Sequence, residues 1–399
     1  MTNVLDRKNI LSESTLIEPH GGKLVDRVLG ALPNVMNRCF RIPLSKELQM
    51  DVEQLAIGTF SPLEGFLNEV DFHSVLDHMR LDSGIVWPLP IILDITEEQS
   101  SSVFKDDNII LTNDKNETLA ILHVEDKYRF DKTDLSKKMY GTNDSQHPGV
   151  QHIKNLHPIL LGGKINLIKK RTPEFKDYEL SPREVRRRFK ENNWKRVVGF
   201  HTRNVIHRGH EYIQLQALEK SNCDGLFIHP VIGKKKSGDF EAKCIVKTYE
   251  RMMSGIYPEN RVLLGLFSTY SRYAGPREAL FTALCRQNYG CSHFVVGRDH
   301  TGVGDYYHPH ASHQIFDEYP EIAITPIIFD KVFYSNELKR YVCSNEQKLS
   351  EDSETQVLSG TRVRKLFQSS QAPPDWFMRR EISDIILHMM EFETNVFVP

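Results

Sequence analysis

A short apolar run that leads into a polar turn and a helix most constrains the fold of this chain. Residues 197–200 are apolar or small and predict a buried strand. The polar turn 201–204 follows, and helical spacing then begins with His207 and His210 three positions apart. Because free backbone N–H groups and the positive end of the helix dipole lie at a helix N-terminus, this order of elements predicts a phosphate site.

Strand and helix patterns alternate from Val197 to about Asp330. Buried-strand candidates lie at 226–232, 262–266 and 294–296, and helical patterns near 243–256 and 277–289 separate them. Such alternation favours an α/β fold with a parallel sheet and crossover helices.

The rest of the chain divides around this region. Residues 1–168 contain short apolar runs split by Gly, Pro, Asn and Asp, which predict a mostly β domain. We expect a catalytic domain over 169–330, and a small C-terminal subdomain over 331–399 that ends in a helix near 378–392.

A second polar turn repeats the design of the first. The apolar run 294–296 leads into Gly297, Arg298, Asp299 and His300. Ligands of open α/β sheets bind at the carboxyl ends of strands, so both turns would form one site if their strands are parallel neighbours. The alternative is a pair of ordinary hydrogen-bonded loops.

The two turns resemble motifs of the ATP sulfurylase (sulfate adenylyltransferase) family. The family pattern Gln-Thr-Arg-Asn-Pro-x-His-Arg-x-His-Glu stands here at 201–211, and Gly-Arg-Asp-His-Ala-Gly stands at 297–302. Further matches lie at 16–24, 60–66, 273–279 and 358–364. The resemblance implies a PUA-like N-terminal domain followed by a Rossmann-like nucleotidyltransferase domain.

The resemblance also implies roles for individual residues. The implied reaction is adenylyl transfer from ATP to an oxyanion, with Mg²⁺ bound to the phosphates. The implied catalytic residues are Thr202, Arg203, Asn204, His207, His210 and Arg298. The implied nucleotide contacts are His201, Thr202, Arg203, Asn204, Gly297, Arg298, Asp299, His300 and Val332. The implied acceptor contacts are His201, Arg203 and Thr301.

Two acceptor-side positions depart from the family pattern. His201 replaces the family's Gln and Thr301 its Ala, and the usual Pro is Val205. Because His can carry positive charge near neutral pH, we expect a reshaped and more cationic pocket. The alternative is a neutral His201 that donates one hydrogen bond as the family's Gln would. Sulfate stays the leading acceptor, with phosphate, a phosphonate or a sulfonate as the alternative. A third hypothesis is a nucleotide-binding homologue that has no catalytic turnover. The retained arginines and histidines argue against it.

Two further basic segments have open interpretations. The segment 233–239, with three consecutive lysines, is either a mobile loop over the phosphates or a solvated turn. Thr361 and Arg364 stand either near nucleotide phosphates or at an ordinary helix start.

Composition excludes several classes of protein. A net charge of −2 gives no electrostatic case for nucleic acid or an anionic membrane. The six cysteines form no Cys-x-x-Cys pair, so we expect no disulfide framework and no zinc, and we assign no residue to a metal. The polar N-terminus and the lack of a long apolar run lead us to expect a cytoplasmic enzyme, and we expect a homo-oligomer.

Overall fold

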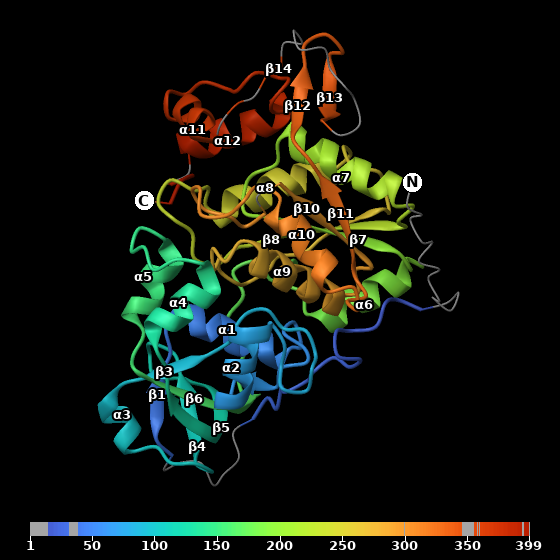
Figure 1. Cartoon of the computed structure of the whole chain (residues 1–399). Helices are drawn as coiled ribbons and strands as arrows, with labels where there is room; N and C mark the ends of the chain where they lie inside the picture. The colour runs from blue at the N-terminus through green and yellow to red at the C-terminus, as the bar shows by residue number, and fades with distance from the viewer. Residues whose placement is uncertain are drawn as a thin grey trace.

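The computed structural model describes residues 15–31, 39–298, 300–344, 355–356, 358, 360–392 and 395–398. Three sheets, each with its own helices, follow one another along the molecule (Figure 1). The N-terminal sheet lies at one end, the C-terminal sheet lies at the other, and the expected catalytic sheet lies between them.

The N-terminal sheet is mixed but mainly antiparallel. Its order is β1-β4-β5-β6-β2, and β3 pairs with β6. Among the described strands of this sheet, only the pairing of β1 with β4 is parallel. The strands are β1 (Arg41–Pro43), β2 (Gly65–Phe66), β3 (Leu93–Ile95), β4 (Asn108–Thr112), β5 (Thr118–Arg129) and β6 (Ile159–Leu167). The helices are α1 (Lys46–Ala56), α2 (Glu69–His78), α3 (Glu97–Ser101), α4 (Lys132–Tyr140) and α5 (Pro148–Asn155).

The middle sheet has five strands in the order β11-β10-β7-β8-β9, and every pairing is parallel. The parallel sheet expected from the alternating pattern is therefore confirmed. The strands are β7 (Val197–Thr202), β8 (Gly225–Pro230), β9 (Val262–Leu264), β10 (His293–Gly297) and β11 (Thr325–Phe329). The helices are α6 (Pro182–Glu191), α7 (Arg208–Lys220), α8 (Ala242–Met253), α9 (Pro276–Tyr289) and α10 (Ala311–Glu318).

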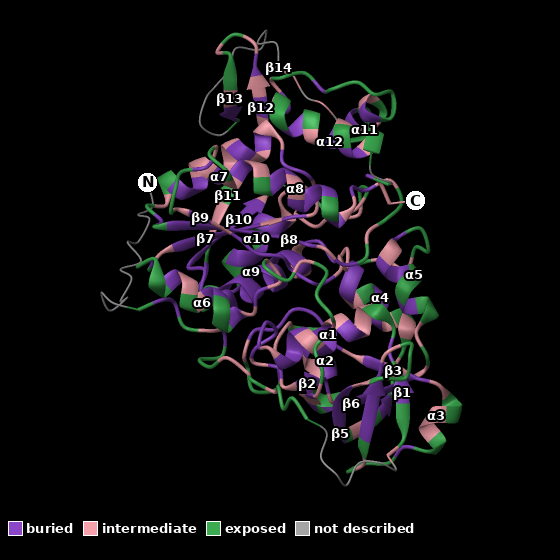
Figure 2. Cartoon of the chain, turned by 180° about the vertical axis from the view of Figure 1, so that it is seen from behind, coloured by how far each residue is buried: buried purple, intermediate pink, exposed green. Residues whose placement is uncertain are grey.

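Helices cover both faces of this sheet, and its inner strands β7, β8 and β10 are largely buried (Figure 2). Phe294 and Val296 pack into the core that contains α6 and α9, whereas Val295 packs into the core that contains α7 and α8. Successive side chains of β10 thus point to opposite faces, as the period of a strand requires. A strand buried on both faces reads as a continuous apolar run, which is why the sequence pattern is clear here.

The C-terminal part adds a three-stranded antiparallel sheet and two helices. The strands are β12 (Val332–Ser335), β13 (Arg340–Cys343) and β14 (Thr355–Gln356), and the helices are α11 (Gly360–Gln368) and α12 (Arg380–Phe392). Arg379, just before α12, makes two hydrogen bonds of 2.8 and 2.6 Å to the carboxylate of Glu211 on α7. This pair ties the C-terminal part to the helix that carries the first motif. In the described part of the chain, no helix could span a bilayer.

The Arg379–Glu211 pair generates a stability prediction. Glu211 is 8 % exposed, so Arg379→Met leaves a mostly buried carboxylate without its partner and should lower the free energy of unfolding by about 2–3 kcal/mol. The matched control is Arg380→Met, whose side chain is 82 % exposed and should change stability by less than about 0.5 kcal/mol. Urea unfolding of both variants measures the difference, and equal stabilities would contradict the role of the pair.

Candidate active site

The first motif places two stacked histidines at the start of α7. His207 is the N-cap residue, and its Nδ1 accepts a hydrogen bond from the backbone N–H of His210 at 3.4 Å. The two imidazole rings stack with centroids 3.9 Å apart, and the ring of Phe377 also stacks with that of His207, with centroids 5.0 Å apart. Because rings packed in this way have little rotational freedom, both histidines are held in place at the start of the helix, where the backbone N–H of Arg208 donates to the carbonyl oxygen of Phe377 at 2.8 Å.

Burial keeps both of these histidines neutral. It lowers the pKa of His210 to about 4 and holds the pKa of His207 well below its usual value. Since the Nδ1 of His207 accepts a hydrogen bond, its proton lies on Nε2. The helix start therefore presents a neutral imidazole N–H at the positive end of the helix dipole, which suits a phosphate oxygen.

The polar turn between β7 and α7 is held by its neighbours. The Oγ1 of Thr202 accepts a hydrogen bond from the backbone N–H of Asn204 at 3.1 Å. The Nζ of Lys235 donates to the carbonyl oxygens of Val231 at 3.0 Å and Arg203 at 3.3 Å. The guanidinium of Arg203 lies over the ring of Tyr273, 5.8 Å from its centroid. The ring of Tyr273 thus helps to orient the positively charged guanidinium of Arg203.

The basic segment 233–239 packs beside this turn. Burial lowers the pKa of Lys235 to about 8, and Lys234 forms an ion pair of 2.8 Å with Glu47 on α1. A cavity of about 310 Å³ lies between this segment and the N-terminal domain, and Lys235 and Tyr273 line it. None of the site residues expected from the sequence lines that cavity.

The second motif meets the first at the carboxyl edge of the sheet. His300 follows β10, and its ring centroid lies 5.4 Å from that of His201 at the end of β7. Burial lowers the pKa of His300 to about 3. Gly297 ends β10 and Arg298 is exposed in the turn, whereas Asp299 lies outside the described residues. Val332 starts β12 and packs with the core that includes α7.

Thr301 adopts a backbone conformation that β-branched residues rarely take, with φ = 58°. Its hydroxyl lies 2.7 Å from the carbonyl oxygen of His300 and 3.1 Å from that of Gly275, and it donates to this pair of oxygens. The hydroxyl is therefore engaged by the backbone.

A buried arginine that sequence reasoning missed lies beneath both turns. Arg286 on α9 is fully buried, and its Nη2 donates to the Nδ1 of His201 at 2.9 Å and to the carbonyl oxygen of His229 at 3.0 Å. Its guanidinium lies 4.6 Å from the ring centroid of Phe267. Among the ion pairs of the described residues, none joins Arg286 to a carboxylate. In the sequence, the signal is the position of Arg286 inside the helical pattern 277–289. In the structure, that helix is buried on all sides.

The pKa of His201 favours the neutral alternative over the charged one. Burial, and after it the charge of Arg286, holds the pKa of His201 well below its usual value. Because Arg286 donates to Nδ1, the neutral ring carries its proton on Nε2. The fixed charge beside this pocket comes from Arg286, and His201 contributes a neutral donor.

Comparisons with known proteins agree with this architecture. Residues 176–389 match the family model described as ATP-sulfurylase, and residues 17–170 match that of a PUA-like domain. The chain is 41 % identical over 372 residues to a sulfate adenylyltransferase of Cenarchaeum symbiosum, covering 93 % of this chain and 97 % of the relative. It is 42 % identical over 385 residues to a sulfate adenylyltransferase of Halothermothrix orenii, covering 94 % and 100 %.

One solved structure is similar in fold. A hexameric APS kinase from Thiobacillus denitrificans aligns with a TM-score of 0.75 at 20 % identity, over 95 % of this chain and 69 % of that one.

Proposed function

The chain belongs to the ATP-sulfurylase family, and from this premise we propose that it transfers the adenylyl group of ATP to sulfate, giving adenylyl sulfate and pyrophosphate. The observation that carries the proposal is the stacked pair of neutral histidines at the start of α7, together with the approach of the two polar turns, in which the rings of His201 and His300 lie 5.4 Å apart. The two sulfate adenylyltransferases that are 41 % and 42 % identical to this chain support the reaction.

In the proposed mechanism, a sulfate oxygen attacks the α-phosphorus of ATP in line with the bond to the β-phosphate. One P–O bond forms while another breaks, and the electron pair of the broken bond leaves with pyrophosphate. Sulfate is already an anion, so the step needs no base and no covalent enzyme intermediate. Catalysis then consists of positioning and of stabilising the charge that develops on the phosphate oxygens.

Each predicted residue has a proposed part in this step. His207 and His210 donate to the phosphate oxygens, and the hydrogen bond of Thr202 to the backbone of Asn204 fixes the turn. Arg203 and Asn204 orient the sulfate and the α-phosphate, and Arg298 supplies a second cation. The remaining nucleotide contacts are proposed for Gly297, Asp299, His300 and Val332.

We propose that Mg²⁺ enters with ATP. The groups described at the start of α7 are N–H donors, which suit phosphate oxygens and do not ligate a hard cation. Mg²⁺ would then be bound by the β- and γ-phosphates and would neutralise the leaving group.

The two changed residues support the alternative in which the acceptor pocket keeps its neutral chemistry. With its proton on Nε2, His201 offers one neutral N–H, as the amide of the family's Gln does. The hydroxyl of Thr301 donates to backbone carbonyls, so it is not available to a ligand. Both substitutions therefore preserve the chemistry of the residues that they replace. Another oxyanion remains the alternative acceptor.

We also propose the compartment, the oligomeric state and the domain bounds of the enzyme. All six cysteines, each within the described residues, are without a disulfide, which supports a reducing cytoplasm. The edge strand β11 exposes Ile328, and such an edge supports a homo-oligomer. We keep the domain division at residues 168 and 330 as a proposal.

The histidine pair generates a prediction on turnover. His207→Asn keeps a good N-cap residue, so the helix should stay while the imidazole donor is lost. This variant and His210→Ala should each lower kcat by about 10²–10³-fold, with a smaller effect on ATP binding. The control is His388→Ala, an exposed histidine on α12. If either site variant keeps the natural turnover, the catalytic role is wrong.

The lowered pKa values generate a prediction on pH. With the pKa of His210 at about 4 and that of His300 at about 3, both rings should stay neutral from pH 8 to pH 6. We expect kcat to be constant over that range and to fall only as the pH approaches 4. Because the unfolded chain takes up these protons near pH 6.5, the free energy of unfolding should also decrease as the pH falls below that value. An activity profile with an apparent pKa near 6.5 would contradict the neutral state.

The acceptor proposal is tested by pyrophosphate release from Mg-ATP. Sulfate should support faster release than phosphate, methylphosphonate or a sulfonate. His201→Gln/Thr301→Ala should change kcat/KM for sulfate by less than about tenfold, which is less than about 1.4 kcal/mol. If sulfate is inert until both residues are changed, another oxyanion is the acceptor.

A further inference from the structure

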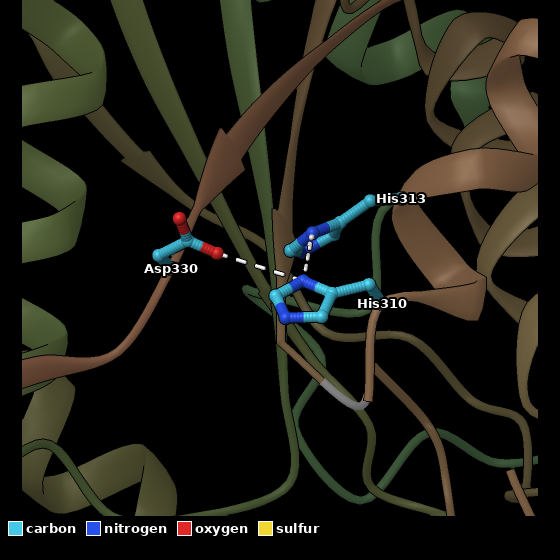
Figure 3. Close-up of side chains that lie close together, drawn as sticks. All are labelled: His310, His313 and Asp330. Atoms are coloured by element: carbon cyan, nitrogen blue, oxygen red, sulfur yellow. Dashed lines mark hydrogen bonds and ion pairs between the residues drawn. The ribbon is translucent and has the colours of Figure 1, made fainter. Parts of the chain in front are cut away.

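Two histidines and a carboxylate lie together near the end of the catalytic sheet (Figure 3). His310 is the residue before α10, His313 lies in the first turn of that helix, and Asp330 lies between β11 and β12. The Nδ1 of His310 lies 3.4 Å from the Nδ1 of His313 and 3.6 Å from the Oδ1 of Asp330. One nitrogen or oxygen atom from each residue lies within 4.8 Å of the other two.

These distances are long for hydrogen bonds but short enough for metal ligands. Hydrogen bonds from N–H to oxygen usually span about 2.7–3.2 Å between heavy atoms, so neither contact is a strong one. In a tetrahedral zinc site with bonds of about 2.0–2.1 Å, adjacent ligand atoms lie about 3.3–3.4 Å apart. The His310–His313 separation matches this value, and the His310–Asp330 separation exceeds it by a few tenths of an ångström.

Burial and charge also suit a cation. His313 is 7 % exposed, whereas the side chains of His310 and Asp330 are 45 % and 31 % exposed. The cluster is thus anchored on one side and open to solvent on the other, which leaves a path for an ion and room for a water ligand. In the described part of the chain, the ion pair of Asp330 is with His310.

We propose that His310, His313 and Asp330 bind one Zn²⁺ ion, with water in the fourth position. Three protein ligands with an open fourth position are a common zinc arrangement, and imidazole with carboxylate is a donor set that zinc accepts. The expectation that the chain holds no zinc rested on its cysteines, and this set needs none. The signal in the sequence was the His-x-x-His spacing at 310–313.

The proposed ion would restrain the rim of the active site. It would join the start of α10 to Asp330, which precedes Val332 by two residues. The segment that leads into this proposed nucleotide contact would then be fixed to the segment that follows the second motif. The proposal does not depend on the adenylyl transfer reaction, because the ion needs neither ATP nor sulfate for binding.

Zinc binding to the full chain tests this site in the absence of nucleotide. Protein stripped with a chelator is titrated with ZnCl₂ in competition with a chromophoric chelator. We expect one equivalent of Zn²⁺ per chain, and excess Mg²⁺ should not displace it because Mg²⁺ prefers oxygen ligands. His310→Ala and Asp330→Asn should each weaken binding by at least about 100-fold, since even second-shell changes cost 10–100-fold. The control His388→Ala should bind as the natural protein does.

Two further measurements keep the outcome clear. His310 and Asp330 are partly exposed, and Asn is close in shape to Asp. Both variants should therefore fold and should unfold on heating at nearly the same temperature as the natural protein. Co²⁺ bound to the natural protein should give the visible absorption of a tetrahedral site, and Asp330→Asn should abolish it. Absence of zinc binding, or equal affinity in both variants and the natural protein, overturns the proposal.

Discussion

The candidate site depends on the parallel pairing of β7 with β10. In this register Phe294 lies opposite Gly199, so the two strands end side by side and both polar turns open at one edge. Gly199 is necessary to this arrangement, because a Cβ atom there would lie 2.9 Å from the side chain of Arg286. One backbone pairing therefore brings the two motifs together and leaves room for the buried cation beneath them.

Electrostatics at this edge combine neutral donors with one buried charge. His207, His210, His201 and His300 are held neutral by burial, so each can donate without carrying its own charge into the site. Arg286 remains protonated although burial lowers its pKa to about 10. A buried cation without a carboxylate partner has an unfavourable solvation energy that a nearby anion relieves. Polyanionic substrates would be bound by such an edge, and its fixed dipoles would need little rearrangement during reaction.

The sequence predicts the fold well where burial is complete and fails where a property depends on tertiary contacts. The apolar runs of β7, β8 and β10 predict the parallel sheet because strands covered on both faces must be apolar throughout. The charge state of His201 could not be predicted, because it depends on Arg286, which is 85 residues away in the sequence. Asp330 approaches His310 only when β11 is paired with β10, so the His-x-x-His spacing at 310–313 could not by itself predict the third member of this cluster.

The central claim is that this site acts by positioning ATP and sulfate for one direct displacement. The stereochemistry at the α-phosphorus tests it most directly. ATP carrying a sulfur atom at the α-phosphate in one known configuration is incubated with sulfate and the enzyme, and the configuration of the adenylyl product is determined. A single in-line attack predicts inversion of configuration. Retention would require two displacements through a covalent enzyme intermediate and would contradict the account.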